Sequence, residues 1–215
     1  MTERFDLIHV GKCGGSSVRA ELLRRQIPHT HVHMVTKPTF SPSSTYVILV
    51  RDPVDRFVSC FNWRRYLLTS GLRPVPEDPV AAYRQAREYE LFEMFANVNE
   101  VGEALETDGA NALGDLLCLV GHVRKGFSWY LDELLDRVSP HQIRGVIATP
   151  TIADDFRRVF GFELSMHQNG GYPAPLGELG ERARSNLEDY LSGEYATLRR
   201  LKRMAPRVAG RLSFV

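Results

Sequence analysis

The stretch that most constrains the fold lies at residues 5–17, where a short apolar run leads directly into a turn rich in glycine and serine. Residues 5–10 are apolar enough to form a buried strand, and helical periodicity begins near Ser16, so the pattern predicts a strand, a turn and a helix N-terminus. Glycines let backbone N–H groups close around an anion, the helix start adds partial positive charge, and Lys12 adds a full one. The turn is therefore predicted to bind a phosphate or a sulfate ester.

A continuous apolar run at residues 45–50, Thr-Tyr-Val-Ile-Leu-Val, is the clearest central strand in the sequence. Such a run without alternation indicates a strand covered on both faces, as in a parallel sheet flanked by helices. Pro53 then starts a helix, and Arg51 lies at the carboxyl end of the strand. In a parallel sheet adjacent strand ends lie at one edge, so we expect Lys12 and Arg51 to lie side by side.

The order of residues in the first turn excludes one kind of nucleotide-binding loop. In the ATP- and GTP-binding loop the lysine follows the last glycine, whereas here Lys12 precedes two glycines. The pattern Gly-Lys-x-Gly-Gly-Ser-Ser instead resembles the 5′-phosphosulfate loop of sulfotransferases that use 3′-phosphoadenosine 5′-phosphosulfate (PAPS). The resemblance implies that Lys12 contacts the phosphosulfate and that the whole turn binds this end of the donor, namely Gly11, Lys12, Cys13, Gly14, Gly15, Ser16 and Ser17.

The residues after the second strand carry a second motif. Arg-Asp-Pro-x-x-Arg-x-x-Ser at 51–59 is similar to the 3′-phosphate-binding motif of the same sulfotransferases. The resemblance implies that Arg51 and Ser59 hold the 3′-phosphate of PAPS, and the planar donor fork of arginine suits a dianionic phosphate. The alternative is a capped helix start at which Asp55 and Arg56 are merely solvated.

Three histidines alternate in the extended stretch between the two motifs. His29, His31 and His33 would share one face of a strand. A metal site, a half-exposed polar strand face and a catalytic base are all open interpretations. An unperturbed pKa near 6.5 suits proton abstraction at neutral pH. Cytosolic sulfotransferases have their base at the equivalent strand, and because His33 is nearest the strand end we prefer His33, followed by His31.

The second half of the chain shows a fainter resemblance. A loop and helix at 121–135, a strand at 142–148 and a helix at 151–160 look like the second half of carbohydrate sulfotransferases. There the loop adds donors near the 3′-phosphate, although a solvated basic loop is an equal alternative here. The family often has Glu after this strand, whereas Thr149 follows it here. The residues that the resemblance implicates are His122, Arg124, Lys125 and Ser128.

The length of 215 residues predicts a single domain over 1–215. Its expected parts are a cofactor-binding core at 5–62, helices at 80–118 on the acceptor side, a second cofactor-side segment at 120–162 and C-terminal helices at 176–204 packed on the sheet. Residues 168–175 are expected to form a flexible loop, a candidate lid. A net charge of +1 argues against a nucleic-acid partner.

The predicted location is the cytoplasm. The first strand begins about four residues after Met1, which leaves no room for a signal peptide, and no run of about 20 apolar residues could span a membrane. Cys13, Cys60 and Cys118 are odd in number and lack metal-ligand spacing, which is typical of reduced thiols.

Together the motifs imply a P-loop-like three-layer α/β fold with a mainly parallel sheet, and a sulfotransferase that moves a sulfuryl group from PAPS to a hydroxyl or amine. The expected product is 3′-phosphoadenosine 5′-phosphate (PAP), and no metal is required. A carbohydrate or small metabolite is the expected acceptor, while a lipid or a protein tyrosine stays open. The alternatives are a P-loop kinase-like protein and a non-catalytic PAPS- or PAP-binding protein.

Overall fold

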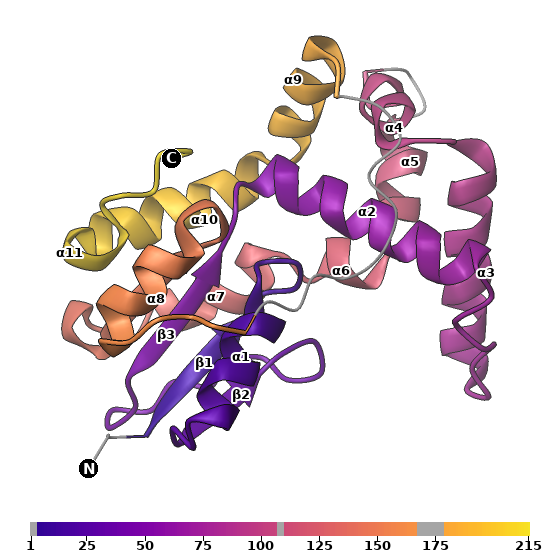
Figure 1. Ribbon diagram of the computed structural model, residues 1–215. Coiled ribbons are helices and arrows are strands. Elements are labelled where there is room, and N and C mark those ends of the chain that lie inside the picture. The colour runs from indigo at the N-terminus through magenta and orange to yellow at the C-terminus, as the bar shows by residue number, and fades with distance from the viewer. Residues whose placement is uncertain (1–3, 107–109, 167–178) are drawn as a thin grey trace. The chain divides into compact units, whose positions relative to one another are not determined.

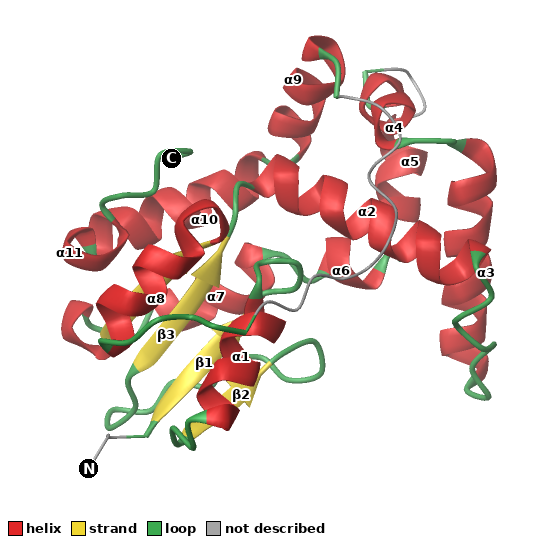
Figure 2. Cartoon of the chain, in the orientation of Figure 1, coloured by secondary structure: helices red, strands yellow, loops and turns green. Residues whose placement is uncertain are grey.

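The computed structural model describes residues 4–106, 110–166 and 179–215. They form two compact units, the first made of Met1–Asp52, Lys125–Gly170 and Gly193–Val215 and the second of Pro53–Arg124 and Gly171–Ser192. The first unit contains a sheet, and the described part of the second is helical (Figure 2).

The sheet of the first unit is parallel throughout, as the sequence predicts (Figure 1). In the described residues it has four strands in the order β2-β1-β3-β4. The chain moves outward in one direction from β1 to β2 and in the other from β3 to β4, so the order reverses between β1 and β3. The carboxyl ends of these two central strands are where an open α/β sheet binds its ligand. The strands are β1 (Phe5–His9), β2 (His29–Val32), β3 (Tyr46–Val50) and β4 (Ile143–Ala148).

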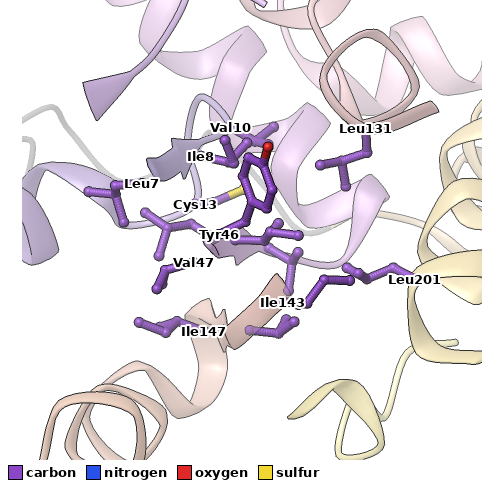
Figure 3. Packing of buried hydrophobic residues seen from close by; sticks show 14 of the residues in the cluster. Leu7, Ile8, Val10, Cys13, Tyr46, Val47, Leu131, Ile143, Ile147 and Leu201 are labelled. Carbon is purple, nitrogen blue, oxygen red and sulfur yellow. The ribbon is translucent and has the colours of Figure 1, made fainter. Parts of the chain in front are cut away.

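The core of this unit lies on both sides of the two central strands. Every residue of β3 is buried, which explains the continuous apolar run in its sequence. Figure 3 shows Tyr46 and Val47 of β3 packed among side chains from the other strands and the helices. The helices of this unit are α1 (Gly15–Arg24), α7 (Phe127–Leu135), α8 (Ile152–Phe160), α10 (Ser192–Met204) and α11 (Pro206–Ala209), with short 3-10 turns η1 (Pro140–Gln142) and η2 (Thr149–Thr151).

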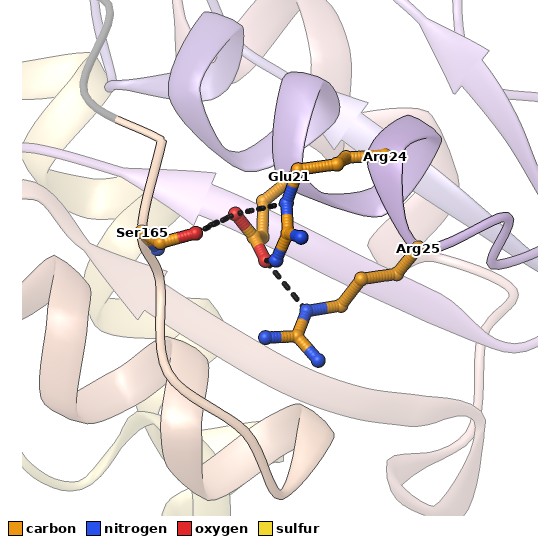
Figure 4. A network of polar contacts seen from close by, with 4 residues as sticks. All are labelled: Glu21, Arg24, Arg25 and Ser165. Atoms are coloured by element: carbon orange, nitrogen blue, oxygen red, sulfur yellow. Dashed lines mark hydrogen bonds and ion pairs between the residues drawn. The ribbon is translucent and has the colours of Figure 1, made fainter.

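A buried carboxylate on α1 holds the segment that follows α8 (Figure 4). Glu21 is fully buried and accepts hydrogen bonds from Arg24 and Arg25, at 2.5 Å each, and from Ser165 Oγ at 2.7 Å. The hydrogen bond from Arg24 is the largest cause that lowers the pKa of Glu21, and those from Arg25 and Ser165 lower it further against the effect of burial. The carboxylate thus ties α1 to residues 144 positions away in sequence.

A second carboxylate caps α7. Glu194 on α10 accepts hydrogen bonds from the backbone amides of Phe127 and Ser128, the latter at 3.3 Å. A Cβ atom at Gly126 would lie 2.2 Å from the Glu194 carboxylate, so this approach depends on glycine. The cap supplies negative charge to the positive end of the helix dipole and joins α7 to α10.

The second unit consists of two chain segments, each inserted between segments of the first unit. The expected helices at 80–118 are present, whereas the loop expected at 121–126 includes the helical turn α6. The prediction that the C-terminal helices all pack on the sheet is wrong for α9. Gly102 has no side chain, so the backbone of Ala183 on α9 approaches α4 closely. The helices are α2 (Pro53–Thr69), α3 (Pro79–Met94), α4 (Val98–Ala104), α5 (Ala110–Leu117), α6 (Gly121–Arg124) and α9 (Glu181–Tyr190).

Two arginines are buried inside this second unit. Arg56 donates to the carbonyl of His122 at 2.8 Å, which overturns the alternative that Arg56 is a solvated residue of a helix start. Arg64 pairs with the buried Glu88. Burial raises the pKa of Glu88, while Arg64 opposes that effect. No described helix is long and apolar enough to cross a membrane.

Candidate active site

The turn after β1 curls its backbone through two left-handed positions. Lys12 has φ 70° and Gly14, the N-cap of α1, has φ 76°. Left-handed residues within a turn direct backbone amides inward, as anion-binding nests do. The first turn of α1 contains no acidic residue, and Gly14 has no side chain to cap it. The positive end of α1 is therefore suited to an anionic group.

Close packing explains both glycines at the start of α1. A Cβ atom at Gly14 would lie 2.5 Å from Ile152 Cδ1, and one at Gly15 would lie 2.1 Å from the ring of His9. Larger residues would push these neighbours away and displace the helix start. The backbone of the turn is therefore held close to α8 on one side and to a histidine ring on the other.

The two motifs meet at the carboxyl ends of β1 and β3. Nη1 of Arg51 donates to the Lys12 carbonyl at 3.4 Å, and both side chains are partly exposed. The sequence-based expectation that these residues lie side by side is confirmed.

Thr149 follows β4, at the position where the sulfotransferases that the sequence resembles often have Glu. Its hydroxyl donates to the Val50 carbonyl at 3.2 Å and so links β4 to β3. The adjoining Asp52 accepts from Tyr195 at 3.0 Å.

Three histidine rings gather at the neighbouring ends of β1 and β2. The rings of His9 and His33 are stacked, with centroids 3.9 Å apart and planes 13° apart. His9 Nδ1 lies 3.0 Å from His31 Nε2, and His33 Nδ1 donates to the His9 carbonyl at 2.7 Å. The register explains the cluster. Because Leu7 lies opposite His31, residues two positions further on lie opposite each other and on the same face.

The environment keeps two of these histidines neutral at neutral pH. Burial is the main cause that lowers the pKa of His31 to about 4, and the charge of Arg19 adds to it. Burial also lowers the pKa of His33, and Arg19 and Lys125 lower it further, while the hydrogen bond to the His9 carbonyl opposes them. A neutral imidazole can accept a proton, so both residues are in the protonation state that a base requires.

His29 does not join the cluster, although it alternates with His31 and His33. Its Nδ1 donates to the Ile27 carbonyl at 2.8 Å, and its ring stacks on Phe5. Sequence reasoning missed His9, whose signal was its place at the end of an apolar strand immediately before the lysine turn. Within the described ranges no group of three or more His, Cys, Asp or Glu residues is arranged to hold a metal ion.

The remaining residues proposed from sequence lie in different surroundings. Lys125 donates to the Met34 carbonyl and lies 4.9 Å from the ring of Trp129. The Ser128 amide donates to Glu194, and its hydroxyl lies 3.2 Å from that of Thr197. In the second unit the backbone carbonyl of His122 holds Arg56, and the other two residues proposed there are the buried Ser59 and the exposed Arg124. The candidate lid at 168–175 falls outside the described residues.

A cavity of about 500 Å³ lies within the second unit. Its lining includes the carboxylates Glu106, Asp115 and Asp189. The guanidinium of Arg182 holds the pKa of Glu106 below its usual range, so that carboxylate is charged at neutral pH. Three carboxylates in this lining disfavour an anionic nucleotide.

The parallel sheet, with a cationic turn at its switch point, defines an α/β protein whose strand ends are suited to an anionic ligand. The family model described as Sulfotransferase domain matches residues 16–129, which is more than half of the chain. The chain therefore belongs to this family and is a PAPS-dependent sulfotransferase. No curated protein and no solved structure gives a significant match to the chain.

Proposed function

We propose that this sulfotransferase binds PAPS across the ends of β1 and β3 and transfers its sulfuryl group to a hydroxyl or amine acceptor, with His33 as the base. The observation that carries the proposal is the contact between the Arg51 guanidinium and the Lys12 carbonyl. It supports a single nucleotide that reaches both the lysine turn and the arginine.

The residues of the turn fit the 5′ end of the donor. The amides of Gly14, Gly15, Ser16 and Ser17 lie at the start of α1, where the helix dipole favours an anion. Lys12 adds a full positive charge in the same turn, and Gly11 and Cys13 complete its backbone. When bound, PAPS supplies an activated sulfuryl group on a phosphate leaving group. Lys12 would stabilise the negative charge that grows on the bridging oxygen, which is the usual contribution of a preorganised cation.

Arg51 suits the 3′-phosphate because its guanidinium offers several donors in one plane. Lys125, in the same unit as Arg51, is a further candidate for this end of the nucleotide. Ser128 is a weaker one, since its hydroxyl and amide already contact Thr197 and Glu194. Neutralising the dianion at this end anchors the donor while the sulfuryl group is transferred.

His33 is better placed than His31 to act as the base. Nε2 of His31 is close to His9, whereas His33 uses its Nδ1 for the His9 carbonyl. His33 also lies just beyond β2, at the same edge of the sheet as Lys12. His33 would accept the acceptor's proton on Nε2 as the acceptor oxygen or nitrogen attacks sulfur and the bond from sulfur to the phosphate oxygen breaks. Such proton transfer typically contributes 10²–10⁴-fold.

The acceptor that we propose is a carbohydrate or a small metabolite. The Gly-Gly-Ser turn and the later helix look more like carbohydrate enzymes than like phenol and steroid enzymes. An acceptor screen with ³⁵S-labelled PAPS and a panel of glycans and metabolites tests this proposal, because the labelled product identifies the acceptor class.

The roles of the three catalytic candidates are tested by single replacements. Lys12→Ala should lower kcat more than it weakens PAP binding, because its charge acts mainly on the developing leaving group. His33→Ala should lower kcat by about 10²–10⁴-fold with PAP affinity retained. His31→Ala should lower it less. Measurements of kcat with labelled PAPS and of PAP affinity by calorimetry decide these assignments, and full turnover in His33→Ala would reject His33 as the base.

A further inference from the structure

The His9 residue contacts both candidate bases through different atoms. Its ring stacks on His33, its Nδ1 faces His31 Nε2 at 3.0 Å, and its backbone carbonyl accepts from His33 Nδ1 at 2.7 Å. His9 itself is 6% exposed, and its contacts with His31 and His33 are partly buried. His9 is also the last residue of β1, where the register with β3 holds its backbone.

The contact between His33 and the His9 carbonyl determines a tautomer. A carbonyl oxygen can only accept a hydrogen bond, so Nδ1 of His33 must carry the proton. In the neutral ring the lone pair then lies on Nε2. This is the nitrogen further from the backbone, and its lone pair is what a general base requires.

The space for the His9 ring is provided by Gly15. A Cβ atom at this position would lie 2.1 to 2.3 Å from three atoms of the ring. The second glycine of the lysine turn therefore has two consequences: it starts α1, and it lets the His9 ring lie flat against His33. Gly15 thus places the lysine turn in direct contact with the histidine cluster.

We propose that His9 is a positioning residue for the base. Its carbonyl fixes His33 in the tautomer with Nδ1 protonated, and its ring fixes the orientation of the His33 ring through stacking and through the contact with His31. This inference rests on the proposed function of His33. After proton transfer His33 carries protons on both nitrogens, and the His9 carbonyl continues to accept from Nδ1, which stabilises the cation.

The charged groups around His33 oppose that cation. Arg19 on α1 and Lys125 before α7 both lower its pKa, and burial lowers it most. The neighbouring His31 ring stays neutral at neutral pH. The His9 carbonyl is the contact that favours the protonated form. His9 therefore sets both the direction of the lone pair and part of its basicity.

The tautomer is tested without any acceptor. Long-range ¹H–¹⁵N correlation NMR of the full-length protein, with and without PAP, reports which nitrogen of each neutral histidine is protonated. We expect His33 in the Nδ1–H form, retained in His9→Phe, with an Nε2–H population that rises in His9→Ala as the ring loses its stacking partner. Nε2–H as the main form of His33 in the wild type overturns the proposal.

The positioning role is tested by activity. His9→Ala should lower kcat by about 10–100-fold, the effect of a misplaced catalytic group, with the KM for PAPS and the PAP affinity changed less than about 2-fold. The acid limb of its pH–rate profile should also shift. His9→Phe keeps the stack and should retain more turnover than His9→Ala. His29→Ala is the matched control, since His29 lies outside the cluster and should leave turnover unchanged.

The outcomes separate this inference from the proposed function. Full turnover in His33→Ala rejects His33 as the base and, with it, the positioning role of His9. Loss of turnover in His33→Ala, with an unchanged kcat and pH profile in His9→Ala, overturns the positioning role alone. If His9→Ala does not fold, the NMR result for the wild type still decides, because it does not need the cavity-forming variant.

Discussion

At the scale of single residues, the site depends on side chains whose neighbours are fixed by backbone geometry. Lys12 adopts φ 70°, a left-handed value that costs a residue with a Cβ atom about 1–2 kcal/mol. Such strain persists where the surrounding structure imposes it, and it concentrates at functional turns. Here the strain coincides with the residue whose carbonyl meets Arg51. The backbone and the side chain of Lys12 thus have separate roles, one linking the strand ends and the other providing charge.

The pH dependence of turnover should respond to Arg19. Burial is the largest cause that lowers the pKa of His33, and the charge of Arg19 lowers it further. Arg19→Gln should therefore raise that pKa and move the acid limb of kcat/KM to higher pH, because the base becomes protonated sooner as the pH falls. The pH–rate profile measures the shift. Arg199→Gln is the control, since Arg199 is exposed on α10 and is not among the charges acting on His33. Equal pH–rate profiles for Arg19→Gln and the wild type would contradict the effect of Arg19 on this pKa.

At the scale of elements, local sequence patterns predicted most of the helices and strands. The features that the sequence did not predict depend on contacts between residues far apart in the chain. The strand at β3 and the helix start at Pro53 follow from an apolar run and a proline. The Ser128 backbone amide donates to Glu194, which is 66 residues away, and no local sequence pattern predicts that contact. His9 joined the histidine cluster only through the register of β1 with β2, which the sequence does not specify.

The tie between α1 and the segment after α8 should contribute measurably to stability. Glu21→Gln removes the charge that holds Arg24, Arg25 and Ser165, and we expect the free energy of unfolding to fall by about 1–3 kcal/mol at neutral pH. The pKa of Glu21 is lowered in the fold, so its contribution is present above the unfolded pKa and is lost as the pH falls.

Chemical denaturation of the wild type and of Glu21→Gln at pH 7 and at acidic pH measures this contribution. The difference between the two proteins should shrink as the pH falls, because the wild-type carboxyl then becomes protonated. Asp154→Asn is a suitable control. Its carboxylate also pairs with an arginine of its own helix but is exposed, so the expected change is below about 1 kcal/mol. A difference that does not depend on pH would contradict the charge-based explanation.

At the scale of the whole molecule, the order of the strands determines where the chemistry can occur. The parallel sheet could be predicted because central strands covered on both faces have continuous apolar sequences. The two motifs could be placed at one edge because adjacent parallel strands end at the same edge of the sheet. The division into two compact units could not be predicted from the sequence. It depends on α9 packing against α4 through a close backbone approach at Gly102, which produces no periodic pattern in the sequence. The family assignment and the contact between the two motifs agree with a donor site at the switch point.

The central claim is that one nucleotide spans the lysine turn and Arg51. Calorimetry with PAP and with adenosine 5′-monophosphate, which lacks the 3′-phosphate, tests it directly in wild type and Arg51→Ala. We predict that Arg51→Ala weakens PAP binding by about 2–5 kcal/mol and leaves binding of the monophosphate nearly unchanged. An equal loss for both nucleotides, or no loss for PAP, would contradict the assignment of Arg51 to the 3′-phosphate.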